Sequence, residues 1–297
     1  MSNHVSNQVS NQVSNQGESN QSKLNESQIA EFQERGYLQA GRVMSDEQAD
    51  ALFARLKDVM AGRGKAAPER IGGWGTERKV VQIVNIWEAD DLFYEHLFNP
   101  TILQMVADVT GTDTLRVWHD QVQYKPPRVG GPTDWHQDHP YWPIIQPADL
   151  VSAWVALEDA DEENGCMWMV PGSHKWGAHK GGTIGTNRED FSPAPDLSLL
   201  PAGIDVTPIP MPVKKGHVGL HHCLTWHGSP NNNSDRGRPA IAVHYMPGYT
   251  RYAKDPAKTH LVEHNVEVRP GEVLKGRHFP TVWEEGRVAQ HPPFNEK

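Results

Sequence analysis

The chain has 297 residues, with 28 basic and 37 acidic side chains, and a formal net charge of −9. This acidic balance argues against a nucleic-acid-binding surface, because such surfaces are normally basic. No run of about eighteen apolar residues occurs, so we expect no membrane-spanning helix. Only two cysteines are present, and the start lacks the charged-then-apolar pattern of a secretory signal. These features predict a cytoplasmic protein without a disulfide framework.

The N-terminal segment is a polar repeat. The string Val-Ser-Asn-Gln starts at Val5 and recurs at Val9 and Val13. Side chains of this kind bury too little apolar surface to offset the entropy lost when the chain becomes ordered. We therefore predict a disordered tail over residues 1–22 and a single domain over residues 23–297.

Capping signals predict helices in the first part of that domain. Asn25 and Gln28 have capping-box spacing, and the apolar stripe that follows them ends at Gly36. An equivalent pair, Ser45 and Gln48, predicts a second helix that ends near residue 62. Two more helices are expected over residues 90–97 and 100–109, with a loop over residues 62–76 between the second and third helices.

Beyond residue 111 the sequence changes to short β-type segments separated by Gly and Pro. The predicted strands cover residues 115–124, 151–157, 167–170, 217–220 and 240–246. Short strands of this kind favour an antiparallel sandwich or barrel, against which the N-terminal helices would pack. Residues 176–213 are rich in Pro and Gly and too long for a plain connection, so we predict a lid or insert there.

The string Trp-His136-Gln-Asp138 carries the strongest chemical signal. If the string is a strand, side chains at positions i and i+2 point to the same face, so His136 and Asp138 would converge on one metal ion. One further histidine would complete the ligand set of the non-heme iron oxygenases. The candidates for it are His217, His221, His222, His227 and His244.

An arginine distinguishes one of these histidines from the others. His227 has an arginine, Arg238, eleven residues downstream. That distance allows a strand end, a turn and the start of the next antiparallel strand, so Arg238 can approach the same cavity. A guanidinium pairs with a carboxylate through two parallel hydrogen bonds. Arg236 is the competing carboxylate partner, and we interpret His221 and His222 as sheet residues.

Several longer strings occur in a specific order. They are Gln28-Ile-Ala-Glu-Phe, His136-Gln-Asp-His-Pro-Tyr-Trp-Pro, Pro147-Ala-Asp-Leu, Ala153-Trp-Val-Ala-Leu-Glu, Asn164-Gly-Cys-Met, Pro171-Gly-Ser-His-Lys and His227-Gly-Ser. Over residues 25–250 the chain resembles the phytanoyl-CoA dioxygenase family, whose members are iron(II)- and 2-oxoglutarate-dependent oxygenases. The resemblance implies a mainly β fold, a double-stranded β-helix (a cupin-like jelly roll) buttressed by the N-terminal helices.

The resemblance also implies roles for particular residues. It implies that His136, Asp138 and His227 bind iron(II). The implied contacts of 2-oxoglutarate are Arg238 at the distal carboxylate, Ser229 beside it, and Gln121, Trp154 and Gln82. At Gln121 and Gln82 this chain departs from the residue types of the best-known family member.

The implied reaction consumes O2 and 2-oxoglutarate, releases succinate and CO2, and oxidises a C–H bond of a small molecule. A carboxylate ligand at Asp138 favours hydroxylation, desaturation, demethylation or ring formation, because halogenating relatives carry a small residue there. We expect a small polar metabolite or natural product as substrate, with acyl-CoA 2-hydroxylation as the alternative. The sequence predicts neither the substrate itself nor the oligomeric state.

Two hypotheses of other classes remain. The chain could be a non-catalytic cupin-like protein that binds a metal or a ligand, or a zinc hydrolase that uses the same His, Asp and His. The arginine eleven residues after His227 disfavours the first hypothesis. The second gives Arg238 no role and lacks an evident general base.

Overall fold

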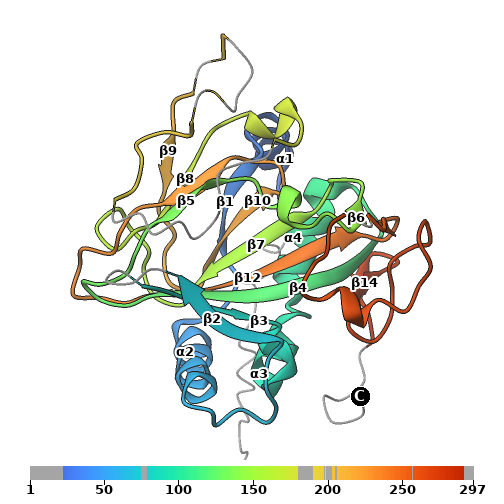
Figure 1. Ribbon diagram of the computed structural model, residues 1–297, viewed down its shortest axis with the longest axis horizontal. Helices are drawn as coiled ribbons and strands as arrows, with labels where there is room; N and C mark the ends of the chain where they lie inside the picture. Colours follow the sequence, from blue (N-terminus) through green and yellow to red (C-terminus); the bar gives the residue numbers. More distant parts are fainter. Residues whose placement is uncertain are drawn as a thin grey trace, which may run out of the picture.

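The computed structural model describes residues 23–74, 79–179, 190–196, 198, 203–204, 206–255 and 257–290. The tail predicted over residues 1–22 lies outside them. Within the described residues, the chain forms a large antiparallel sheet and a smaller four-stranded antiparallel sheet. In the view of Figure 1, helices α2 and α3 lie below the strands β2 and β3, and the strands β5, β8 and β9 of the smaller sheet lie at the upper left.

The large sheet contains most of the strands. Its order is β1 (Tyr37–Arg42), β10 (His217–His222), β7 (Val151–Ala156), β12 (Arg238–Pro247), β4 (Thr114–Lys125), β14 (Thr281–Glu284) and β15 (Arg287–Val288). Strand β3 (Val80–Val84) also pairs with β4 and joins β2 (Arg70–Trp74) to the sheet. Neighbours in the order are often distant in the sequence, so the sheet is built from long-range crossovers.

The smaller sheet has the order β5 (Thr133–His136), β11 (His227–Ser229), β8 (Met167–Met169) and β9 (Ile209–Met211). A separate two-stranded ribbon pairs β13 (Arg251–Tyr252) with β6 (Ile145–Gln146). Two antiparallel sheets with these crossovers form the cupin-like jelly roll that the family resemblance implies. The prediction of the fold class is therefore confirmed.

The four N-terminal helices lie close to the ranges that the sequence predicts. They are α1 (Glu26–Arg35), α2 (Asp46–Met60), α3 (Asp91–His96) and α4 (Pro100–Thr110). Both capping boxes form, with the Gln28 amide donating to the Asn25 side chain at 2.9 Å. Gly36 ends α1 with a φ of 78°, a left-handed conformation that glycine adopts without strain. None of the described helices combines the length and the apolar character needed to span a membrane.

Alternation along the strands separates the two faces of the large sheet. On β12, Ile241, Val243 and Tyr245 pack in the core formed with the helices. Ala240 and Ala242, between them, pack in a second cluster with residues of the smaller sheet. The helices thus cover the outer face, and the inner face is directed towards the smaller sheet, where the candidate site lies.

Several strands fall where the sequence analysis predicts none, among them β2, β9 and β14. The predicted loop over residues 62–76 contains β2. Gly73 permits the close pairing of β2 with β3, because a Cβ atom at this position would lie only 2.1 Å from the Val80 carbonyl oxygen. The predicted irregular segment 176–213 contains β9, which pairs with β8. Strand β14 was likewise not predicted. Its four residues gain their order by pairing with β4.

Candidate metal and cosubstrate site

Strand pairing in the smaller sheet brings three predicted ligands together. His136 ends β5 and pairs directly with His227, the first residue of β11. Asp138 follows two residues after β5. One potential ligand atom from each of the three lies within 4.8 Å of the others, and all three side chains are buried. A single metal ion can therefore contact all three.

The convergence of His136 and Asp138 has a different cause from the one expected. Strand β5 ends at His136, and Asp138 has helical backbone angles, with φ −69° and ψ −48°. The turn into the 3-10 helix His139–Tyr141, rather than the pleat of a strand, therefore directs the carboxylate towards the histidine. The prediction that both residues lie on one strand face is wrong, although their side chains do converge.

Backbone contacts fix the tautomers of the two histidines. The Nδ1 atom of His136 lies 2.7 Å from the Asp134 carbonyl oxygen, and that of His227 lies 2.9 Å from the Thr225 carbonyl oxygen. A carbonyl oxygen only accepts, so Nδ1 donates and Nε2 keeps its lone pair. Burial also lowers the pKa of His227 well below its usual range. His227 is therefore neutral, the form that binds a metal.

The carboxylate offers one oxygen to this centre. Asp138 Oδ1 lies 3.6 Å from His136 Nε2 and 3.7 Å from His227 Nε2. Burial tends to raise the pKa of Asp138, but the imidazoles that surround this carboxyl group hold its pKa well below the usual range. Two imidazole nitrogens and one carboxylate oxygen form the donor set of a non-heme iron(II) centre with open positions.

Arg238 is a buried cation. It is the first residue of β12 and has no solvent exposure. Burial lowers its pKa to about 10, so the guanidinium stays charged near neutral pH. Its three nitrogens have no hydrogen-bond partner among the described residues, and its Cζ lies 5.2 Å from the centre of the Trp154 ring. An uncompensated buried charge costs several kcal/mol, so this environment fits a carboxylate ligand.

A second buried cation supports the same region. Lys125 on β4 lies opposite Arg238 and donates to the Ser229 hydroxyl at 2.6 Å and to the Pro230 carbonyl oxygen at 2.6 Å. Burial and the nearby Arg238 hold the pKa of Lys125 well below its usual range. Ser229 therefore contacts the lysine that lies opposite Arg238 in the strand register. The role of Lys125 was missed, although it opens the Lys-Pro-Pro string in the sequence.

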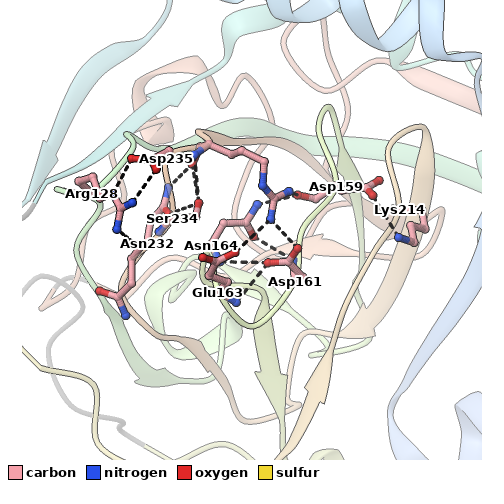
Figure 2. Close-up of polar contacts among 11 residues, drawn as sticks. Arg128, Asp159, Asp161, Glu163, Asn164, Lys214, Asn232, Ser234 and Asp235 are labelled. Carbon is pink, nitrogen blue, oxygen red and sulfur yellow. Dashed lines mark hydrogen bonds and ion pairs between the residues drawn. The ribbon is translucent and has the colours of Figure 1, made fainter.

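The loop between β11 and β12 separates the two candidate arginines. Arg236 lies at the surface and pairs with Asp161 at 2.6 Å. The buried Asn232 holds the loop in shape: its amide donates to the Arg236 carbonyl oxygen at 2.6 Å, and its oxygen accepts from the Ser234 amide at 3.0 Å. Figure 2 shows this loop and the neighbouring acidic turn that contains Asp161. The eleven-residue span thus delivers Arg238, and not Arg236, to the interior.

A cavity of about 430 Å³ opens next to His136 and Asp138. Its polar lining includes Gln82 and Gln121, and the Gln82 amide donates to the Gln121 side-chain oxygen at 2.7 Å. The rest of the lining is Arg70, Gly73, Val84, His119, Gln123, Tyr141, Trp142, His260 and Leu261. The residues expected to contact the cosubstrate therefore fall into two groups, one in this cavity and one around Arg238.

Two further contacts of the carboxylate were missed by the sequence analysis. Ser152 Oγ lies 3.0 Å and His221 Nε2 lies 3.2 Å from Asp138 Oδ2. His221 and His222 lie on β10, as predicted for sheet residues, but only His221 faces the metal ligands. The available signal was the alternation Ser152-x-Trp154, which places two site residues on one strand face.

Comparison with known proteins agrees with this geometry. The profile of the family described as Phytanoyl-CoA dioxygenase (PhyH) matches residues 32–240. The chain is 25% identical over 270 residues to phytanoyl-CoA dioxygenase domain-containing protein 1 of Bos taurus, covering 75% of this chain and 90% of that protein. It is 30% identical to the Mus musculus protein of that name over 173 residues, covering 57% of this chain and 58% of the mouse protein.

A solved structure is similar along nearly its whole length. It is the non-heme alpha ketoglutarate dependent carbocyclase SnoK from nogalamycin biosynthesis, with 26% identity, a TM-score of 0.72, and coverage of 89% of this chain and 99% of that one. The jelly roll, the donor set and these relatives define an iron(II)- and 2-oxoglutarate-dependent oxygenase. Within that class, the chain belongs to the phytanoyl-CoA dioxygenase family.

Proposed function

We propose that the protein oxidises a C–H bond of a small polar metabolite or natural product while it converts 2-oxoglutarate to succinate and CO2. In this proposal, His136, Asp138 and His227 hold iron(II). When bound, iron(II) and 2-oxoglutarate supply the oxidation: one oxygen atom of O2 enters succinate as CO2 leaves, and the other oxidises the substrate. The protein binds and orients the reactants.

The observation that carries the proposal is the buried, unpaired guanidinium of Arg238. The guanidinium lies over the ring of Trp154. Trp154 and Ser152 are two residues apart on β7, so their side chains lie on the same face of the sheet, and Ser152 contacts Asp138. The cation and the metal ligands therefore lie along one inner face. A dicarboxylate that binds the metal at one end can place its distal carboxylate on Arg238, with the Ser229 hydroxyl beside it, and so compensate the buried charge.

The cavity next to the metal ligands supports a polar substrate. The carboxamides of Gln82, Gln121 and Gln123 come from the neighbouring strands β3 and β4, and all three line the cavity. Arg70 and His260 add further polar groups at its wall. A cavity of this size and lining favours a small molecule that bears several hydrogen-bonding groups, and the similar carbocyclase comes from the biosynthesis of a natural product, nogalamycin.

The test is a succinate-release assay on Fe2+-loaded protein with a panel of small polar metabolites, natural products and acyl-CoA thioesters. We expect oxygen-dependent succinate formation that one polar compound stimulates, with that compound gaining oxygen or losing hydrogen. Stimulation by acyl-CoA alone would contradict the proposed substrate class. Turnover that persists with Zn2+ and without O2 would contradict the reaction and favour a hydrolase.

A further inference from the structure

Four polar residues form a row across the inner face of the large sheet. In the register of the strands, His119 on β4 lies opposite His244 on β12, His244 lies opposite Ser152 on β7, and Ser152 lies opposite His221 on β10. All four side chains are buried. Buried polar groups are costly unless they are hydrogen-bonded, so a row of this kind requires a partner.

For Ser152 and His221, that partner is one oxygen of Asp138. The two oxygens of this carboxylate have different surroundings. Oδ1 faces the Nε2 atoms of His136 and His227 at 3.6 and 3.7 Å. Oδ2 instead contacts Ser152 Oγ at 3.0 Å and His221 Nε2 at 3.2 Å. An ionised carboxylate only accepts, so both the hydroxyl and the imidazole N–H donate to Oδ2.

His244 fixes the direction of the hydroxyl. Its Nδ1 atom lies 2.7 Å from Ser152 Oγ. The single hydroxyl hydrogen of Ser152 is directed to Asp138, so His244 Nδ1–H donates to Ser152 Oγ. Burial lowers the pKa of His244 to about 4, so its imidazole is neutral and carries this one N–H. A continuous chain of donors thus ends on Oδ2.

We propose that Ser152 and His221 are positioning residues that hold Oδ2 away from the metal, so that Asp138 binds through Oδ1 alone. The inference rests on the proposed function, because it assumes that the three ligands hold a metal. A carboxylate that bound through both oxygens would take one of the open positions of the centre. Keeping Asp138 on one oxygen leaves those positions for the 2-oxoglutarate chelate and for O2.

The test measures metal binding directly. Metal-free full-length protein is titrated with Co2+, followed by calorimetry and by the visible Co2+ spectrum, which responds to coordination number. We expect His221→Phe and Ser152→Ala to weaken Co2+ binding by about 10- to 100-fold, the usual effect of losing an outer hydrogen bond, and to change the spectrum. His221→Gln retains an N–H donor at a similar distance and should restore both towards wild type.

A neighbour on the same strand provides the matched control. His222 follows His221 on β10 but is directed to the other face, so His222→Phe should leave Co2+ affinity and spectrum unchanged. Wild-type affinity and spectrum in both His221→Phe and Ser152→Ala would overturn the positioning role while leaving the proposed function intact. Failure of the wild type to bind one Co2+ would overturn both. Ser152→Ala removes a single oxygen atom, so it keeps the test valid if His221→Phe does not fold.

Discussion

At the residue scale, Arg238 is the side chain that most needs a ligand. Its guanidinium is fully buried and unpaired within the described part of the chain, and the nearby cation Lys125 already donates to Ser229 and Pro230. Two adjacent buried cations with neutral partners are unfavourable unless an anion binds between or beside them. The arrangement is therefore more consistent with a site for an anionic cosubstrate than with a stabilising element of the core.

Arg238→Ala should weaken 2-oxoglutarate binding strongly and leave metal binding nearly unchanged. Truncation of one partner of a buried charged pair commonly costs about 2–5 kcal/mol. At about 1.4 kcal/mol per factor of ten, that is a loss of roughly thirty- to several-thousand-fold in affinity. Arg236→Ala is the control, because that side chain is about half exposed and pairs at the surface. Titration with 2-oxoglutarate checks both, and a reversed order of effects would refute the assignment of the cation.

The sequence predicted some site residues and not others, for a physical reason. His136, Asp138, His227 and Arg238 could be found because spacing along the chain relates them. Ser152 and the other members of its row lie on four strands that are far apart in the sequence. Their meeting depends on strand order and register, which no local pattern encodes.

At the element scale, the loop between β11 and β12 determines where Arg238 lies. Asn232 is fully buried, and its amide donates to the carbonyl oxygens of Lys125, Pro126 and Arg236 at 3.2, 3.1 and 2.6 Å. These contacts tie the loop to the end of β4. The loop is therefore a fixed spacer, and the eleven-residue count in the sequence is informative because the loop has one shape.

Asn232→Ala should destabilise the protein and weaken 2-oxoglutarate binding. The substitution leaves the buried Ser234 backbone amide without its acceptor, and an unsatisfied buried polar group costs about 1–3 kcal/mol. In a chain of this size, each kcal/mol lost from the free energy of unfolding lowers Tm by roughly 2–4 °C, so Tm should fall by several degrees. Thermal melts and 2-oxoglutarate titrations measure the two effects. Unchanged cosubstrate affinity in a destabilised variant would mean that the loop does not set the position of Arg238.

The segment over residues 176–213 remains a predicted lid. Many of its central residues lie outside the described part of the chain, but two of its described residues contact the neighbours of His136. The Gln137 amide donates to the Gly177 carbonyl oxygen at 2.9 Å, and Trp135 Nε1 donates to the Ser192 carbonyl oxygen at 2.9 Å. We propose that the segment covers the bound substrate.

Limited trypsin digestion tests the lid. Lys180 and Arg188 lie within the segment. Cleavage there should be slowed by Co2+, 2-oxoglutarate and the substrate found in the succinate assay, because the closed segment would be less accessible. Equal cleavage rates with and without the ligands would contradict the proposal. Cleavage elsewhere in the chain serves as the internal control.

Helices were predicted more accurately than short strands. Capping boxes and a terminal glycine mark the ends of α1 within its own sequence. Strand β2 contains two glycines, and its order comes from pairing with β3. A strand that is stabilised mainly by its partner carries little local signal, which explains why β2 was read as a loop.

At the scale of the whole molecule, the polar tail and the domain can be separated by deletion. Leu24 is buried in the core, and its amide donates to Asp108 at 2.9 Å. Deletion of residues 1–22 should leave Tm and turnover nearly unchanged, because we predict that the tail does not pack against the domain. Deletion of residues 1–24 is the control. It removes a buried leucine worth about 1.5–3 kcal/mol and should lower Tm. Equal loss in both would show that the tail packs.

The central claim is that one inner face holds both the metal ion and 2-oxoglutarate. The most direct measurement is an anaerobic absorption titration, because 2-oxoglutarate chelated to Fe2+ gives a visible charge-transfer band. We predict a band that requires both Fe2+ and 2-oxoglutarate, that survives in His222→Ala and that disappears in His227→Ala. A band of full intensity in His227→Ala, or no band in the wild-type protein at saturating Fe2+ and 2-oxoglutarate, would contradict the account.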